Sequence, residues 1–133
     1  MAAAAGSQGL IDTDILIDAA RGVVAAMAFL NGQLALAALH ISIISAMELV
    51  AGCRNRGELL VVKRFLQTVT VVPVTAAGSR RAIRLMESFS LSHGLEVPDA
   101  LIAATALTRR RRLYTKIVRH FQMIPSLVVV RPY

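Results

Sequence analysis

Three acidic side chains stand in unusually apolar surroundings, although the chain of 133 residues contains only eight acids. Asp12 follows Leu-Ile, Glu48 lies between Ala-Met and Leu-Val, and Asp99 precedes Ala-Leu-Ile-Ala-Ala. A carboxylate in such a setting is costly to bury unless it is paired, hydrogen-bonded or bound to a metal. No basic residue is close by in the local sequence of any of the three. If they converge, they would repel one another and hold a divalent cation, and hard oxygen ligands suit Mg²⁺ or Mn²⁺.

Each acid also has a simpler interpretation. Asp12 could merely end a strand, and Asp99 could be an acid favoured by the dipole of a helix N-terminus. Glu48 could close a capping box with Ser45, and Asp14 is favoured as a helix N-cap over a ligand. Taken singly, these simpler interpretations are the better ones. If the acids all lie at one edge of a sheet, however, a shared site explains them better than several separate structural roles.

Strands alternate with helical segments along the chain. Short runs rich in β-branched residues predict strands at 9–13, 40–43, 68–74, 113–115 and 127–130. Helices are predicted at 15–20, from 22 to 30 with a continuation or restart at 34–39, and at 45–52, 58–67, 76–93 and 99–110. This alternation predicts an α/β fold, with a central, mostly parallel sheet of four to five short strands and helices on both faces. We expect a single domain over residues 1–133, with residues 1–8 as a flexible start.

The predicted sheet would bring the three acids to one edge. Ligands of such sheets bind beyond the carboxyl ends of the strands. Asp12 ends the first strand, and Glu48 lies in the helix after the second. Asp99 opens a helix whose following strand ends at Thr115, again near that edge.

The composition agrees with a buried parallel sheet, because hydrophobic residues make up 56% of the chain and charged residues 17%. The net charge of +7 comes from the second half: residues 67–133 carry ten basic and three acidic groups, whereas residues 1–66 carry five of each. A basic half indicates a polyanion such as nucleic acid, or an acidic protein, although a solvated face explains charge alone equally well. The single cysteine, Cys53, excludes an internal disulfide and agrees with a reducing compartment.

Residues 22–47 contain no Asp, Glu, Lys or Arg, which raises the question of a membrane segment. A spanning helix needs roughly 20 mostly apolar residues. Here Asn31, Gly32 and Gln33 interrupt the stretch, and the pieces on either side are too short. A small membrane-associated protein is therefore a disfavoured alternative, and we predict no membrane segment. Residues 1–8 also lack the basic start and apolar stretch of a secretion signal.

Four motifs follow one another in an order and spacing that resemble those of a known family. They are Leu-Ile-Asp12-Thr-Asp-Ile-Leu-Ile-Asp18, Ser42-Ile-Ile-Ser-Ala-Met-Glu48-Leu, Pro98-Asp99-Ala-Leu-Ile-Ala-Ala-Thr-Ala and Leu113-Tyr-Thr115-Lys-Ile-Val-Arg-His120-Phe. The chain resembles PIN-domain proteins from residue 9 to residue 130, and most closely the VapC toxins of toxin–antitoxin pairs.

The resemblance implies an endoribonuclease that uses Mg²⁺ or Mn²⁺, with Asp12, Glu48 and Asp99 as its catalytic carboxylates and metal ligands. It also implies an RNA substrate, a cognate antitoxin, and a homodimer or a higher toxin–antitoxin assembly. Such a protein is expected in the cytoplasm.

The fourth motif departs from the family pattern. Many members have Thr-x-Asn-x-x-Asp-Phe there, whereas this chain has Ile117 for the asparagine and His120 for the acid. Loss of the asparagine removes a polar group that could orient a carboxylate or a metal-bound water. The sequence therefore leaves open a second hypothesis, a catalytically weakened PIN-like binding module that acts through a protein partner.

Further residues are candidates for contacts around the acids. Thr115 and His120 are predicted to contact a carboxylate, a water or a phosphate, although each could also be structural. A basic run could hold RNA phosphates, and it consists of Arg109, Arg110, Arg111 and Arg112. Arginines at a helix end also complement the helix dipole, so the run has a simpler explanation as well.

Overall fold

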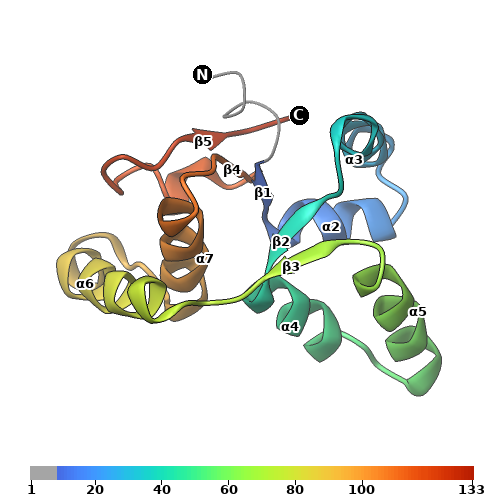
Figure 1. The fold of residues 1–133 in the computed structure, drawn as a ribbon, viewed down its shortest axis with the longest axis horizontal. Helices are drawn as coiled ribbons and strands as arrows, with labels where there is room; N and C mark the ends of the chain where they lie inside the picture. The colour runs from blue at the N-terminus through green and yellow to red at the C-terminus, as the bar shows by residue number, and fades with distance from the viewer. Residues whose placement is uncertain (1–8) are drawn as a thin grey trace.

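A five-stranded sheet, parallel throughout, stands at the centre of the computed structural model, which describes residues 9–133 (Figure 1). The strand order is β3-β2-β1-β4-β5. The strands are β1 Leu10–Ile11, β2 His40–Ser42, β3 Thr70–Val72, β4 Leu113–Tyr114 and β5 Val129–Val130. The predicted α/β class and parallel sheet are thus confirmed, while the expectation of a flexible start at 1–8 lies outside the described residues.

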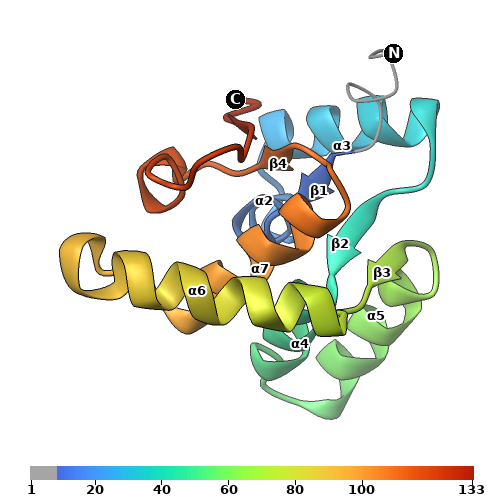
Figure 2. The same ribbon diagram turned by 60° about the vertical axis from the view of Figure 1, so that its left-hand side comes forward.

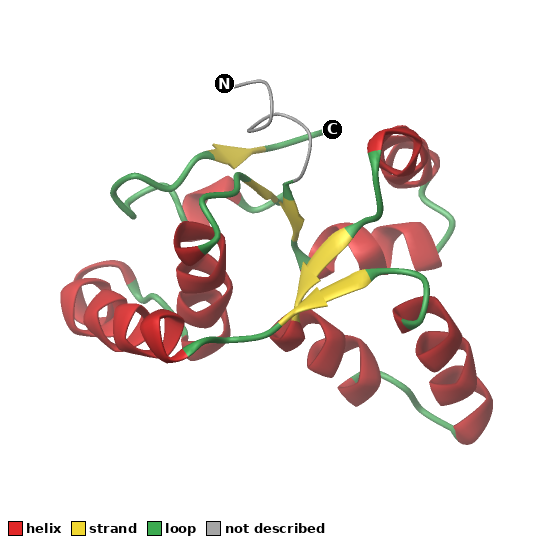
Figure 3. Ribbon diagram, viewed as in Figure 1, coloured by secondary structure: helices red, strands yellow, loops and turns green. Residues whose placement is uncertain are grey.

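Within residues 9–133, six α-helices and one short 3-10 helix connect the strands (Figure 3). They are α2 Thr13–Ala20, α3 Val24–Leu36, α4 Ile43–Ala51, α5 Arg56–Leu66, α6 Ala76–His93, α7 Val97–Thr108 and η1 Val118–His120. The pair α6 and α7 lies side by side (Figure 2), and α2 to α5 lie toward the other side of the sheet (Figure 1).

Two hydrophobic cores form, one on each face of the sheet, because neighbouring residues of a strand point to opposite faces. Leu10 and Leu113 pack with residues of α6 and α7. Ile11 and Tyr114, one position further along the same strands, pack with residues of α2, α3 and α4. The predicted covering of both faces by helices is therefore confirmed.

Helix α6 has the bounds that the sequence predicts. Thr75 caps its start, where the hydroxyl accepts a hydrogen bond from the Gly78 amide at 3.0 Å. Gly94 ends it in the left-handed conformation, with φ of 69°, which glycine adopts without steric cost.

Of the two alternatives for the segment after Gly32, the structure shows the continuation, because α3 runs through this residue to Leu36. A glycine inside a helix costs only about 1 kcal/mol. Burial of Ala26 and Leu30 on one side of α3 is enough to hold the helix together across that position.

Two predicted caps are wrong, and both errors concern the acids. Asp12, not Asp14, is the N-cap of α2, and its carboxylate accepts a hydrogen bond from the Thr13 amide at 2.8 Å. Helix α4 begins earlier than expected, so its N-cap is Ser42, whose hydroxyl accepts from the Ser45 amide at 3.0 Å. The expected capping box of Ser45 with Glu48 does not form, and Glu48 is available for other contacts.

No single helix within residues 9–133 has both the length and the apolarity to cross a membrane. Helices α2 and α3 meet the requirements of length and apolarity only when they are taken together, and they are bent by 115° relative to one another.

Candidate active site

The predicted acids line one pocket of about 340 Å³ at the carboxyl ends of β1 and β2. Its lining comprises Asp12, Thr13, Asp14, Ile17, Glu48, Glu96, Pro98, Asp99, Ile117 and His120. The parallel strands bring the ends of β1 and β2 together, and α7 contributes its first turn. Residues from four separate segments therefore meet at the edge that the sequence pattern indicates.

Asp12 is the most deeply buried acid of the pocket, with only 8% of its surface exposed. Burial raises its pKa from 3.8 to about 7, and the nearby charge of Asp14 adds to the effect. Hydrogen bonds from the Thr115 hydroxyl, at 2.8 Å, and from the Thr13 amide act in the opposite direction. The fold thus holds a carboxylate where its charge is unfavourable in the absence of a cation.

Asp14 joins the pocket, which sequence reasoning missed by treating it as a cap. Its Oδ2 accepts a hydrogen bond from the Lys116 amide at 2.9 Å. Its Oδ1 is buried and has no hydrogen-bond partner among the described residues. The signal was its position in the first turn of α2, immediately beyond the strand end that carries Asp12.

Glu48 is held by a chain of buried hydroxyl groups. The Thr13 Oγ1 lies 2.6 Å from Glu48 Oε1 and 2.8 Å from the Ser45 Oγ. Thr13 has one hydroxyl proton and donates it to the carboxylate, so Ser45 is the donor in its contact with Thr13. Ser42, 3.3 Å from the Ser45 Oγ, completes the chain as a donor. Three hydroxyls, from α2, α4 and the end of β2, thus orient one carboxylate.

Asp99 and His120 form the remaining side of the pocket. His120 Nδ1 lies 3.3 Å from Asp99 Oδ2. Burial raises the pKa of Asp99, His120 opposes that shift, and the charges of Glu96 and Glu48 add to it. The sequence predicts contacts for Thr115 and His120, and the structure brings both to carboxylates.

Ile117 lines the pocket where the family pattern has an asparagine. Its backbone amide donates to the Thr115 hydroxyl at 3.1 Å, so the segment is held in place although the side chain is apolar. The neighbouring Lys116 forms an ion pair with Asp18 at 2.6 Å, and the Tyr133 hydroxyl donates to the same carboxylate at 2.8 Å. These contacts fix the strand end against α2.

The arginine run lies away from the acids. It follows the C-terminus of α7, whereas Asp99 lies in the first turn of that helix, and the twelve residues between these ends span about 18 Å. None of the four arginines lines the carboxylate pocket. Any contact that they make with RNA is therefore remote from the acids.

The donor set suits a hard divalent cation. Every acid of the pocket offers oxygen, and the unpartnered Asp14 Oδ1 adds a buried acceptor. As the side chains stand, no three His, Cys, Asp or Glu residues within 9–133 are close enough together to hold a metal ion. Asp12, Asp14, Glu48 and Asp99 are the residues that could bind one.

Fold, site and sequence agree on one class of protein. The PIN-domain family profile matches residues 9–116, which include all four acids named above. The chain belongs to the PIN-domain family.

Its relatives within that family carry a more specific name. Ribonuclease VapC10 of Mycobacterium tuberculosis is 40% identical over 119 residues, covering 89% of each chain. Ribonuclease VapC19 of the same organism is 39% identical over 124 residues, covering 89% of this chain and 95% of the relative. The predicted kinship with VapC proteins is confirmed.

Solved structures give the same result. A toxin–antitoxin complex from Klebsiella pneumoniae contains a chain with a TM-score of 0.78 and 31% identity, covering 95% of this chain and 98% of that one. A DNA-bound VapBC from Salmonella typhimurium, with a TM-score of 0.79 and 20% identity over 95% of this chain and 98% of that one, shares the fold.

Proposed function

We propose that the protein is a metal-dependent endoribonuclease that hydrolyses RNA phosphodiester bonds and acts as the toxin of a toxin–antitoxin pair. The observation that carries this proposal is the pocket at the carboxyl edge of the sheet, where a buried aspartate with a pKa of about 7 stands among other acids. The identity of 40% to a named ribonuclease supports the choice of RNA as substrate.

In this proposal, Asp12 and Asp99 bind Mg²⁺ or Mn²⁺, and Glu48 binds it directly or through water. When bound, the ion would polarise the phosphodiester and lower the pKa of a water molecule that attacks phosphorus. Binding would require these side chains to move closer together, because no three His, Cys, Asp or Glu residues within 9–133 are close enough to share an ion as they stand.

The neighbouring residues act by holding these carboxylates. Thr115 donates to Asp12, which keeps one oxygen aligned with the pocket. Thr13 does the same for Glu48. His120 lies at the pocket wall beside Asp99, where its ring could donate a hydrogen bond to a phosphate.

Cleavage of a cellular RNA pool tests the proposal. Purified protein should cleave it with Mn²⁺ or Mg²⁺ and leave it intact with EDTA. The Asp12→Asn variant keeps the size of the side chain and should lose at least about 100-fold of the rate, in the range by which electrostatic groups act in active sites. Equal cleavage by this variant would show that the pocket is not the catalytic centre.

Ile117 favours a second candidate, a PIN-like module that binds a partner without efficient catalysis. An apolar side chain at this position cannot orient a carboxylate or a metal-bound water. Calorimetric titration with Mn²⁺ separates the two candidates: a functional centre binds the ion and loses binding in Asp12→Asn, whereas a degenerate module shows no heat of binding in either protein.

The proposed protein partner is an antitoxin, and the complex would be a homodimer of the toxin or a larger assembly, acting in the cytoplasm. The comparison structures include toxin–antitoxin complexes. An apolar groove of about 290 Å³ suits a partner, and it is lined by Leu16, Ala19, Ala20, Leu30, Leu49, Val61, Val62 and Phe65. Val61 is 64% exposed at its border.

A further inference from the structure

A second pocket, of about 320 Å³, lies at the C-terminal end of α7, opposite the carboxylates. Its lining comprises Arg81, Ala106, Leu107, Arg110, Arg111, Arg112, Ser126 and Val128. Arg81 comes from α6, three arginines come from the turn between α7 and β4, and Ser126 comes from the loop before β5. We call these residues the arginine pocket. Among the residues that the structure describes, no acidic side chain lines it.

The backbone at the arginine pocket is unusual. Arg110, with φ of 55°, and Ser126, with φ of 68°, are the only non-glycine residues at positive φ within 9–133, and both line it. An L-residue in this region is strained, and glycine usually takes such a place after a helix. The chain therefore carries an arginine where a glycine would fit the backbone better. Such strain is commonly found at binding sites.

The helix dipole does not explain this arrangement. One or two cations in the last turn are enough to complement the C-terminus of a helix. Arg81 belongs to a different helix, yet it lines the same pocket. Arg81 and Arg110 are exposed and make no ion pair within the described part of the chain.

The local electrostatics also favour an anion. Burial and the charge of Arg109 lower the pKa of Arg111. Burial together with the charges of Arg111 and Arg109 lowers the pKa of His40, at the start of β2. The positive charges at this end of the molecule thus repel one another, and a bound anion would reduce that repulsion.

We propose that the arginine pocket binds a backbone phosphate of the RNA substrate at a point remote from the cleaved bond. This inference rests on the proposed function. Planar guanidinium groups from several segments suit phosphate oxygens, which they can contact in pairs. The pocket is remote from the carboxylates by the length of α7, about 18 Å.

The course of such an RNA follows from the elements that border both sites. The cleft beside Asp99 is bordered by His93 from α6 and by Arg119 and His120 from η1. The arginine pocket is bordered by Arg81 from α6 and by Ser126 from the loop that follows η1. Both therefore lie along α6 and the segment 117–128, and a folded RNA stem can reach from one to the other.

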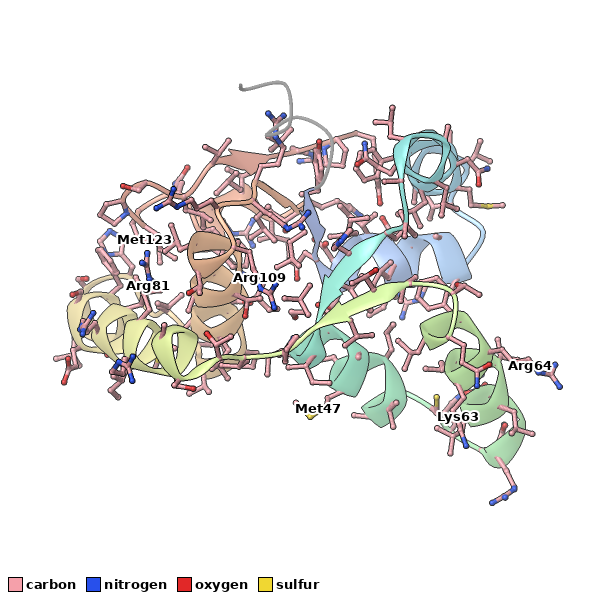
Figure 4. The ribbon with its side chains drawn as sticks, viewed as in Figure 1. Met47, Lys63, Arg64, Arg81, Arg109 and Met123 are labelled. Carbon is pink, nitrogen blue, oxygen red and sulfur yellow. The ribbon has the colours of Figure 1, made fainter. Side chains whose placement is uncertain are left out.

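A binding experiment without catalysis tests the inference. The double variant Arg81→Ala/Arg110→Gly removes two guanidinium groups and restores the glycine that the backbone at position 110 favours. Lys63→Ala/Arg64→Ala is the matched control, because it removes two cations from α5, on the other side of the molecule from Arg81 (Figure 4). The probe is a fluorescent RNA hairpin with a stem of about 12 base pairs, long enough to span α7, measured by anisotropy in EDTA over a range of NaCl concentrations.

We expect the double variant to bind the hairpin about tenfold more weakly at low salt, with a slope of log Kd against log salt that falls by about one to two. The control should change affinity by less than about twofold, as expected for charges that contact no phosphate. Thermal denaturation should show the double variant folded and no less stable than the wild type, because Arg110→Gly relieves backbone strain.

Three results would overturn the inference. The first is an unchanged affinity and slope in the double variant, and the second is an equal loss of affinity in the control. The third comes from a parallel titration with polyglutamate, which stands for an acidic protein: the double variant loses binding to polyglutamate while its RNA binding stays intact. Hydrolysis of RNA by the wild type with Mn²⁺ is measured separately. A wild-type protein that binds the hairpin through Arg81 and Arg110 but cleaves nothing would contradict the proposed activity and leave the phosphate site standing.

Discussion

At the residue scale, the site is built around a conflict between burial and charge. Asp12 is 8% exposed, and its neighbour Asp14 is also an acid. The hydrogen bonds from Thr115 and Thr13 compensate only in part, since the pKa still rises to about 7. A cation bound in such a pocket would offset the cost of burying these charges.

The first prediction follows from this raised pKa. A folded-state pKa above the unfolded value means that the folded protein binds the proton more tightly. The contribution of Asp12 to stability is present below pH 4 and is lost as the pH rises through about 7. In EDTA at pH 8, Asp12→Asn should therefore raise the free energy of unfolding, by about 1–3 kcal/mol.

Urea denaturation in EDTA at pH 5 and pH 8 measures this effect. The difference between variant and wild type should be larger at pH 8. With Mn²⁺ added, the order should reverse, because only the wild type gains stability from the bound ion. A difference that is the same at both pH values would contradict the assigned pKa shift.

The second prediction concerns position 120, where this chain has a histidine and many family members have an acid. His120→Asp places a carboxylate beside Asp99, in the position where many family members have an acid, and should strengthen Mn²⁺ binding by about tenfold. Ser88→Asp is the control, because it also adds one carboxylate, at an exposed position of α6 that lines neither the carboxylate pocket nor the cleft beside Asp99. Calorimetry measures both affinities, and an equal gain in both variants would indicate a general effect of added charge.

At the scale of elements, helix starts decide where the acids point. Helix α2 begins directly after Asp12, so this residue serves as N-cap and pocket acid together. Helix α4 begins after Ser42, and this early start turns Ser45 inward toward Thr13. The expected capping box would have turned Glu48 back onto its own helix. Its absence leaves the Glu48 carboxylate in the pocket.

The third prediction tests the hydroxyl chain. Ser45 is fully buried, and Ser45→Ala removes the donor to Thr13 while leaving the backbone cap of α4 intact. The variant should lose about 1 kcal/mol of stability, and Mn²⁺ binding should weaken by about tenfold because Glu48 is less firmly held. Ser88→Ala, at an exposed position of α6, should change neither. Unchanged metal affinity in Ser45→Ala would remove the positioning role.

At the scale of the whole molecule, the two hydrophobic cores meet across the sheet. Where neighbouring segments approach closely there, little space is left for a larger side chain. A Cβ added at Gly9 would lie 2.2 Å from a ring carbon of Tyr114 and 3.0 Å from Arg112 Cγ. Tyr114 is itself buried and packs edge-on against Phe29 of α3. Its ring therefore has little room to move.

The fourth prediction compares two glycines. Gly9→Ala should destabilise the protein by about 1–3 kcal/mol through this overpacking. Gly32→Ala, inside α3 with nothing within 4 Å of the added carbon, should instead stabilise it by about 0.5–1 kcal/mol. Thermal denaturation of the two variants is the measurement, and shifts of the same sign would contradict the packing at Gly9.

The sequence by itself determined the fold class and the approximate positions of the strands, and it pointed to Asp12, Glu48 and Asp99 as candidate site residues. These follow from short-range patterns: β-branched runs, Gly94 and Pro98 at helix ends, and acids that stand in apolar stretches without local partners. A parallel sheet then brings strand ends to one edge whatever the details of packing. The resemblance to the PIN-domain family has a different basis, the order and spacing of the four motifs.

Only the tertiary structure decided which acids share the pocket and which hydroxyls hold them. The caps of α2 and α4 lie two and three residues earlier than the sequence predicts, and these shifts changed the roles of Asp14 and Glu48. The assembly of Arg81 with Arg110 also depends on how α6 packs against α7, because no local pattern relates residues so distant in sequence. Long-range packing therefore placed the cations at one end of α7 and the carboxylates at the other.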